Sequence, residues 1–230
     1  MNDQDRLNRA GAEEIARRAE LAATLEIFEV PQGSPEWFEL RRGLPTSSEF
    51  AAIMANSSDR KGRASYMRRL AGEIITGDIA EMFANGLPAP MRRGQEQEDE
   101  ARRTYSLITD NVVRRIGFAR DLDKGAGCST DGLIGEDGVL ELKSMRADLL
   151  IETIEKDEFP NAHYWQCQGA LWILRRQWCD LAIYCPKMPL FIKRVVRDED
   201  KCAKLAAEIQ SFRVDLLSMV ARVKTYGGGV

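Results

Sequence analysis

The pattern of hydrophobic and polar residues divides the chain into a helical first half, a β-rich middle and a helical end. Apolar residues three and four positions apart predict helices in the first half. These are residues 11–25, a short helix opened by Ser34 and Pro35, residues 50–54, residues 63–76 and about residues 92–106. Residues 46–49 (TSSE) have the capping-box pattern, and Gly77 is a stop signal. Residues 87–90 (LPAP) read as a loop.

The middle of the chain has β-like character and is followed by further helices. The predicted strands are residues 26–30, 112–119, 128–135, 139–144, 181–184 and 190–196, and the later helices are 146–156, 161–176 and 198–226. A tight turn containing Asp137 and Gly138 joins two of these strands. This order predicts a mixed α/β (α+β) fold with a central mixed β-sheet flanked by helices. We expect one domain over 1–230, with an N-terminal helix (1–25), a core (30–196) and a C-terminal helix (198–226).

Composition narrows the class of protein. The chain has 230 residues and no run of eighteen apolar residues, so no transmembrane helix is expected, and its charged start does not resemble a secretory signal. Five scattered cysteines without a C-x-x-C pair indicate free thiols rather than a zinc site.

The net charge of −3 argues weakly against a nucleic-acid partner, but arginine pairs such as Arg41–Arg42 and Arg102–Arg103 recur along the chain. An acidic metal site surrounded by basic phosphate contacts gives such a balance. Solvated helix faces are the alternative.

Candidate chemistry lies in the predicted strand pair of the middle region. Alternation along the strand puts Val139, Glu141 and Lys143 on one face, and Asp131 lies one hairpin away. Two carboxylates beside an ammonium group are unfavourable in a core but suit a hard divalent cation and a water. The main-chain carbonyl of Leu142 is a further candidate ligand. Such a site could hydrolyse phosphodiesters, with the lysine orienting the water and offsetting negative charge.

Plainer interpretations exist for these residues and for others. The hairpin could carry a surface aspartate and an exposed Glu-x-Lys stripe, because such tripeptides are common by chance. His163, the only histidine, is interpreted as a packing residue. The cysteines are interpreted as buried hydrophobic residues, and the tryptophans as core residues rather than base-stacking platforms. These tryptophans are Trp37, Trp165, Trp172 and Trp178.

Four blocks in order make a family resemblance specific. The spacing D-x9-E-x-K resembles the signature of the PD-(D/E)XK nuclease superfamily. The blocks at residues 32–43 (QGSPEWFELRRG) with 46–49, at 93–98 (RGQEQE) and at 165–172 (WQCQGALW) resemble the phage lambda exonuclease and YqaJ recombinase family. The resemblance implies a restriction-endonuclease-like nuclease core. Thr130 departs from it, since the family usually has proline before the metal-binding aspartate, so we expect a slightly different approach of the strand with the chemistry retained.

The resemblance also implies roles for individual residues. It makes Asp131, Glu141, the Leu142 carbonyl and Glu98 the ligands of Mg²⁺, as two ions that Mn²⁺ can replace, and Lys143 the catalytic lysine. It makes Arg41, Ser48 and Ser129 the ligands of a DNA 5′-phosphate, with Gln166 near the scissile strand. A guanidinium and a hydroxyl at a helix start both suit a phosphate.

The activity implied is 5′→3′ degradation of one strand of linear double-stranded DNA, which leaves a 3′ overhang for recombination by single-strand annealing. The implied partners are DNA ends with a 5′-phosphate, two further copies of the chain in a homotrimeric ring, and a single-strand annealing protein, with no membrane. The place of action is the cytoplasm of the bacterial host of a phage or prophage. The alternatives are a restriction- or repair-type endonuclease of the same superfamily, which would cut closed circular DNA, and a non-catalytic protein that binds DNA ends.

Overall fold

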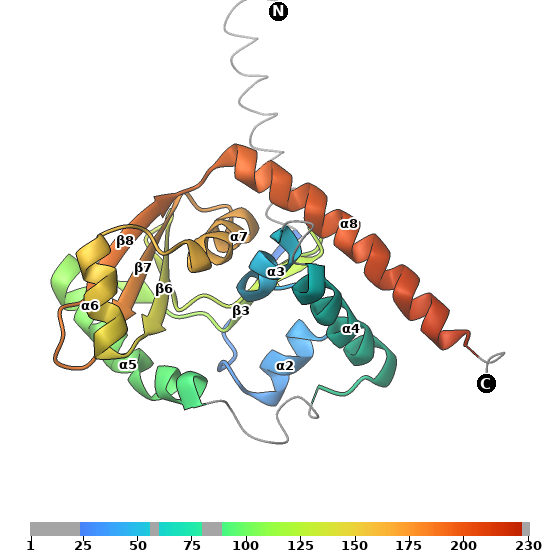
Figure 1. Cartoon of the computed structure of the whole chain (residues 1–230), viewed down its shortest axis with the longest axis horizontal. Coiled ribbons are helices and arrows are strands. Elements are labelled where there is room, and N and C mark those ends of the chain that lie inside the picture. Colours follow the sequence, from blue (N-terminus) through green and yellow to red (C-terminus); the bar gives the residue numbers. More distant parts are fainter. Residues whose placement is uncertain (1–23, 56–59, 80–88, 227–230) are drawn as a thin grey trace, which may run out of the picture.

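The chain folds into two β-sheets with helices packed around them (Figure 1). The structure is a computed structural model that describes residues 24–55, 60–79 and 89–226. The larger sheet has the strand order β2-β5-β6-β7-β8. Its strands are β2 (Val113–Arg114), β5 (Gly132–Ile134), β6 (Gly138–Ser144), β7 (Trp178–Tyr184) and β8 (Phe191–Val196). The pair β6–β7 is parallel and the other pairs are antiparallel, which confirms the predicted mixed sheet.

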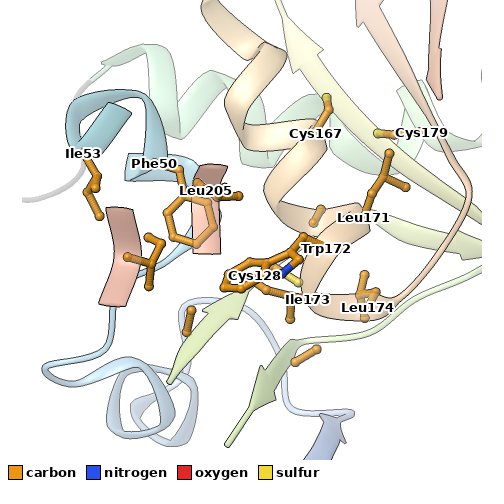
Figure 2. Close-up of a cluster of buried hydrophobic side chains, with 14 of the residues drawn as sticks. Phe50, Ile53, Cys128, Cys167, Leu171, Trp172, Ile173, Leu174, Cys179 and Leu205 are labelled. Atoms are coloured by element: carbon orange, nitrogen blue, oxygen red, sulfur yellow. The ribbon is translucent and has the colours of Figure 1, made fainter. Parts of the chain in front are cut away.

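Alternation along β6 and β7 sends side chains to two different hydrophobic clusters. Val139 belongs to the cluster that includes α7 (Tyr164–Leu174), whereas Leu140 and Leu142 pack with Ala101 and Tyr105 of α5 (Ala89–Thr109). The sheet is therefore covered by α7 on one face and α5 on the other. Figure 2 shows how α7 also contacts Phe50 of α3 (Phe50–Met54) and Leu205 of α8 (Glu199–Lys224) in the main core.

The smaller sheet has the strand order β1-β3-β4 and includes the first described strand of the chain. Its strands are β1 (Leu25–Phe28), β3 (Phe118–Asp121) and β4 (Ala126–Cys128). Two predicted strands are corrected here: residues 112–119 and 128–135 are each divided between the two sheets. Each contains a break at which the chain passes from one sheet to the other, a change of partner strand that alternation along a single segment does not predict.

The helices of the first half follow the predicted order. They are α2 (Pro35–Arg41), the 3-10 helix η1 (Ser47–Glu49), α3 and α4 (Arg60–Thr76), which Gly77 ends. Ser34 caps α2 by accepting a hydrogen bond from Trp37 N. The predicted capping box at residues 46–49 is wrong, because its two reciprocal hydrogen bonds do not form. The side chain of Glu49 pairs with Arg69 instead, and Thr46 N donates to the hydroxyl of Tyr66. Tertiary partners on α4 have replaced the local reciprocal bonds.

Gly169 of α7 sets how closely η1 and α3 approach this helix. A Cβ at this position would lie 2.4 Å from the ring of Phe50 and 3.2 Å from Ser47. The glycine of the block at 165–172 thus permits the close packing that fixes the segment carrying Thr46 and Ser48.

The remaining helices complete the layers. They are α6 (Ala147–Lys156), the 3-10 helix η4 (Asn161–His163), α7 and α8, which lies along α4 in Figure 1. The predicted helix at 11–25 lies almost wholly outside the described residues, as does the start of the predicted loop at 87–90, and α5 already includes residues 89 and 90. Among the described helices, none has the length and apolar character needed to cross a membrane.

Candidate active site

The start of strand β5 holds Asp131 against strand β6. Asp131 N donates to Leu140 O at 3.1 Å, and its Oδ2 accepts from Leu142 N at 2.6 Å. Thr130 is fully buried, and its hydroxyl donates to the same Leu140 carbonyl at 2.7 Å. Thr130 therefore adds a bond of its own to strand β6, next to the bonds of Asp131, and the aspartate still faces β6.

Glu141 and Lys143 project together from β6, as alternation predicted. Lys143 Nζ lies 2.8 Å from Glu141 Oε1, and Gln166 Nε2 from α7 donates to the same oxygen. Glu141 is only 4% exposed, so the interpretation as an exposed Glu-x-Lys stripe is wrong. Burial lowers the pKa of Lys143, but the charges of Glu141 and Asp131 outweigh this effect and raise it. The ammonium group is therefore fully charged at neutral pH.

Carboxylates converge on Asp131 from two sides. Burial raises its pKa well above the usual range, and the negative charges of Glu141 and Glu98 raise it further, while Lys143 opposes them. Such a concentration of like charge is costly without a cation to share it. The arrangement is that of a site built to hold positive charge.

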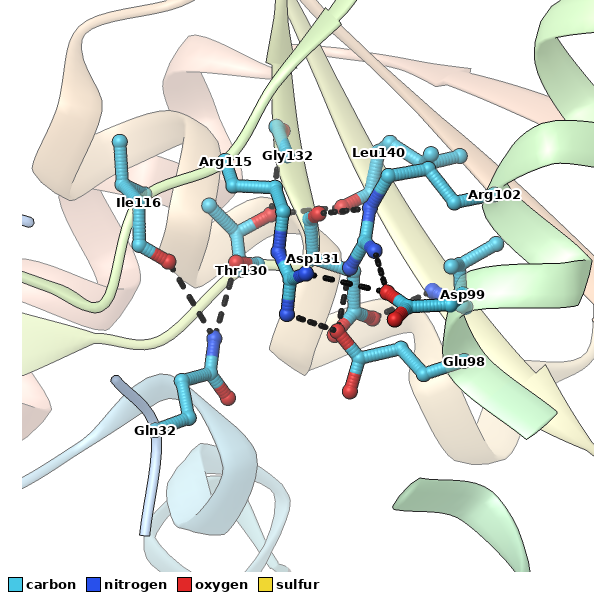
Figure 3. A network of polar contacts seen from close by, with 11 residues as sticks. Gln32, Glu98, Asp99, Arg102, Arg115, Ile116, Thr130, Asp131, Gly132 and Leu140 are labelled. Carbon is cyan, nitrogen blue, oxygen red and sulfur yellow. Dashed lines mark hydrogen bonds and ion pairs between the residues drawn. The ribbon is translucent and has the colours of Figure 1, made fainter. Parts of the chain in front are cut away.

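Helix α5 supplies the second side of this cluster, which Figure 3 shows from close by. Arg102 is almost fully buried: its Nε donates to Asp131 O at 3.1 Å, and its terminal nitrogens pair with Glu98 and Asp99. Arg115 pairs with Asp99 at 3.0 Å and lies 3.8 Å from Glu98. Arg102 thus connects the main chain of Asp131 to the carboxylate of Glu98.

The donor set of this cluster fits a hard divalent cation. Leu140 O accepts from Asp131 N, whereas Met145 N donates to Tyr184 O on the other side of β6. Because hydrogen-bonding direction alternates along a strand, the carbonyl of Leu142 points to the Asp131 side. Carboxylate and carbonyl oxygens are the ligands that Mg²⁺ prefers. Among the described residues, no three acidic, histidine or cysteine side chains already form a metal cluster, since Glu98 and Glu141 are held by the cations and the amide named above.

A second group of polar residues surrounds Arg41 at the end of α2. Arg41 donates to Ser129 Oγ at 2.9 Å and to Thr46 Oγ1 at 3.4 Å, and Thr46 Oγ1 lies 3.4 Å from Ser48 Oγ. In the described part of the chain, no carboxylate forms an ion pair with Arg41. Burial lowers the pKa of its guanidinium, although the group stays charged at neutral pH. A half-buried cation whose hydrogen-bond partners in the described chain are hydroxyl groups is a natural anion site.

The structure places the residues expected to bind DNA in two different places. Arg41, Ser48 and Ser129 lie together, whereas Gln166 lies beside Glu141 in the carboxylate cluster. The two places are connected by the chain itself, since Ser129 precedes Asp131 by two residues.

Four residues that the sequence did not assign to the site hold this connecting segment and the pocket. Gln32 Nε2 donates to Thr130 O at 3.2 Å, and Trp37 Nε1 donates to Ser129 Oγ at 2.9 Å. Thr46 and Arg102 complete the contacts. Gln32 and Trp37 belong to the block at 32–43, and Arg102 follows Glu98 by one helical turn. Their positions in or beside a family motif could have indicated that they belong to the site.

The plain interpretations of other residues have mixed outcomes. Trp37 is not a core residue: its ring lies under the Arg41 guanidinium, 4.1 Å from ring centroid to Cζ. The five cysteines are free, and all except Cys185 are buried. His163 lies near the charge of Lys143, and burial together with that charge lowers its pKa to about 4. His163 is therefore neutral at physiological pH.

Comparison with known proteins identifies what this arrangement resembles. The family model of the YqaJ-like viral recombinase domain matches residues 36–177, which include every candidate site residue. An alkaline exonuclease from Laribacter hongkongensis is 30% identical with a TM-score of 0.75, and its complex with dAMP is 31% identical with a TM-score of 0.74. Each match covers 83% of this chain and 96% of the other.

A phage-related exonuclease from Haemophilus somnus 129PT shares the fold with a TM-score of 0.53 at 14% identity, over 76% of this chain and 96% of that one. Curated protein sequences give no significant match. The expected nuclease fold is confirmed by the similarity to the Laribacter structures.

Proposed function

The chain belongs to the YqaJ-like viral recombinase family, and on this premise we propose that it is a 5′→3′ exonuclease that degrades one strand of linear double-stranded DNA. The product is a duplex with a 3′ single-stranded overhang, ready for phage-type recombination by strand annealing. Two observations on relatives support this proposal: the similar solved proteins are described as exonucleases, and one of them was solved with dAMP, a mononucleotide.

The spacing between Ser129 and Asp131 carries the proposal. Ser129 belongs to the anion pocket and Asp131 to the carboxylate cluster. Two residues of chain span at most about 7 Å, which is of the order of the distance between consecutive phosphates along one DNA strand. A terminal phosphate held at Arg41 therefore presents the next phosphate to Asp131, and cleavage there releases one 5′-mononucleotide.

Mg²⁺ is the cation that we propose for the carboxylate cluster, as two ions with Mn²⁺ able to substitute. Asp131, Glu141, the Leu142 carbonyl and Glu98 would hold it, and when bound it would activate a water and offset charge on the phosphate. Lys143 is the catalytic lysine: its ammonium group, held by Glu141, orients the attacking water and stabilises negative charge on the phosphate oxygens. Gln166 fixes the orientation of Glu141 and faces the scissile strand.

Arg41, Ser48 and Ser129 form the proposed 5′-phosphate pocket. The guanidinium is already oriented by the Trp37 ring and by Ser129, so little conformational entropy is lost when a phosphate binds. Every cut regenerates a 5′-phosphate, which must enter this pocket before the next cut. The pocket thereby gives the enzyme its polarity.

Family membership also supports the proposed assembly and place of action. We expect a homotrimeric ring around the DNA, cooperation with a single-strand annealing protein, and activity in the cytoplasm of a bacterial host. The rival function is that of an endonuclease with the same core, which has no use for a terminal phosphate and cuts closed circular DNA.

The experiment compares initial rates on matched linear duplexes with a 5′-phosphate or a 5′-hydroxyl, and on closed circular DNA, in Mg²⁺ and in EDTA. The wild type should prefer the 5′-phosphate, leave the circle intact and require metal. Arg41→Gln should reduce the preference by roughly 10- to 100-fold, since a hydrogen bond to a charged group contributes about 1.5–3 kcal/mol. Arg42→Gln, at the exposed neighbouring position, is the matched control. Cutting of circles, or equal rates on both ends, would refute the proposal.

A further inference from the structure

A second guanidinium lies on the wall of the cavity beside Arg41. This cavity lies between α2 and α4. Its lining combines aromatic and aliphatic side chains with two arginines: Trp37, Phe38, Arg41, Leu44, Thr46, Tyr66, Arg69, Leu70, Glu73 and Ile79. Arg69 belongs to neither the block at 32–43 nor the carboxylate cluster, and the roles assigned above do not use it.

The bonding of Arg69 is incomplete. One terminal nitrogen pairs with Glu49 Oε1 at 2.7 Å, and the guanidinium lies 4.8 Å from the centroid of the Tyr66 ring. Its Nε is buried, and no described residue accepts a hydrogen bond from it. Buried donors are nearly always paired in folded proteins, so an unpaired guanidinium nitrogen next to a cavity indicates a missing acceptor.

The charge distribution around the cavity indicates what that acceptor is. The pKa of Arg41 is lowered first by burial and further by the positive charge of Arg69, so the two guanidinium groups lie within electrostatic reach of each other. Of the two carboxylates nearby, Glu49 faces Arg69, and Glu73 accepts a hydrogen bond from Gly43 N at 2.8 Å. Two cations against one cavity suit a ligand that carries more than one negative charge.

We propose that Arg69 is a second phosphate-binding residue, through which the pocket selects a terminal phosphate monoester over an internal phosphodiester. A monoester carries close to two negative charges at pH 8, because its second pKa is about 6, whereas a diester carries one. Arg41 supplies the first cation, and Glu49 neutralises Arg69 until the terminal phosphate arrives. This inference rests on the proposed function and adds to it the means by which an end is distinguished from an internal position.

The test uses one blunt duplex with three different 5′ ends: phosphate, methylphosphate and hydroxyl. The methylphosphate end has the charge of a diester. Binding of each duplex is measured in EDTA at pH 8, and initial rates are measured in Mg²⁺. The wild type should rank the ends in the order given.

Arg69→Gln should reduce the ratio of phosphate to methylphosphate by about tenfold and leave the ratio of methylphosphate to hydroxyl unchanged. Arg69→Lys should keep most of the first ratio, because it retains the charge. Glu49→Gln should increase the first ratio, because it frees Arg69. Arg68→Gln, at the exposed adjacent position on α4, is the matched control and should change neither ratio.

The outcomes separate this inference from the function it rests on. If Arg69→Gln folds normally by circular dichroism and keeps the wild-type ratio of phosphate to methylphosphate, the second cation is refuted while 5′-phosphate recognition by Arg41 stands. If Arg69→Gln lowers both ratios equally, Arg69 supports the pocket only structurally, and the inference is refuted. A wild type that ranks all three ends equally refutes the 5′-phosphate pocket itself.

Discussion

Buried charges are partnered differently in two neighbouring regions of the larger sheet. Asp180 of β7 accepts hydrogen bonds from the Tyr105 hydroxyl at 2.6 Å and from two nitrogens of Arg194 at 2.7 and 2.9 Å. Asp131 precedes β5, on the other side of β6, and lies close to further carboxylates, while the hydrogen-bond partners described for Arg41 are hydroxyl groups. A buried charge with every partner in place contributes to the fold, whereas a buried charge without its counter-ion indicates a site for a ligand.

The largest effect should come from removing the charge of Asp131. Asp131→Asn should lower the rate of cleavage by about a thousandfold or more, since a metal ligand contributes several kcal/mol to catalysis. It should not lower the midpoint of thermal unfolding in EDTA, because it relieves repulsion from Glu141 and Glu98. Rates on linear duplex and melting curves measure the two effects. A large loss of stability would instead show that the charge of Asp131 stabilises the fold, as expected for Asp180.

The opposite result is expected at Asp180. Asp180→Ala should reduce the free energy of unfolding by about 2–4 kcal/mol, because it leaves the buried Tyr105 hydroxyl and the Arg194 guanidinium without their acceptor. Urea titration measures this loss, and Asp123→Ala on the exposed β3–β4 turn is the control. The rate per folded molecule should stay that of the wild type. A selective loss of rate with normal stability would contradict the division between the two regions.

Arg102 combines features of structural and functional charges: it is fully paired, and it also contacts the candidate active site. Arg102→Lys keeps a positive charge beside Glu98 but cannot also donate to Asp131 O in the same geometry. We expect activity to fall by about 10- to 100-fold, as for other residues that orient metal ligands. The metal concentration needed for half-maximal rate should rise. If that concentration is unchanged, Arg102 does not position the ligands.

The smallest effect concerns Asp121, another buried and fully paired carboxylate. Burial raises its pKa, but Lys124 and Arg175 outweigh burial and hold the pKa below the usual range. Its contribution to stability is therefore present above the ordinary carboxyl pKa of about 3.9 and is lost as pH falls through the lowered value. Asp121→Asn should flatten the acid side of the stability curve, and Asp123→Asn should not. If Asp121→Asn and Asp123→Asn have the same dependence of stability on pH, Asp121 does not make this contribution.

Sequence patterns predicted the parts of the site that depend on local order. Strand alternation placed Glu141 and Lys143 on one side of β6, and the hairpin brought Asp131 beside them. The family blocks indicated Arg41, Ser48 and Ser129 as neighbours, and the structure brings them together.

The missing parts depend on contacts between distant segments. Gln32 and Thr130 are 98 residues apart, and Arg102 and Asp131 are 29 apart, so no window of local periodicity contains both partners. The incorrect capping box has the same cause: Glu49 is used by Arg69, a residue of another helix. Propensity gives way to tertiary partners at these positions.

The contact between α2 and Ser129 also determines when the phosphate pocket can form during synthesis of the chain. Trp37 and Arg41 bond to a residue 92 and 88 positions later, and closing a loop of that length costs about 4 kcal/mol in chain entropy. At 5–20 residues per second, the ribosome makes the second half of the pocket roughly 5 to 20 seconds after the first. The parallel partner of β6 follows later still. A nascent chain therefore has neither the phosphate anchor nor a supported Glu141 until these later segments have been made.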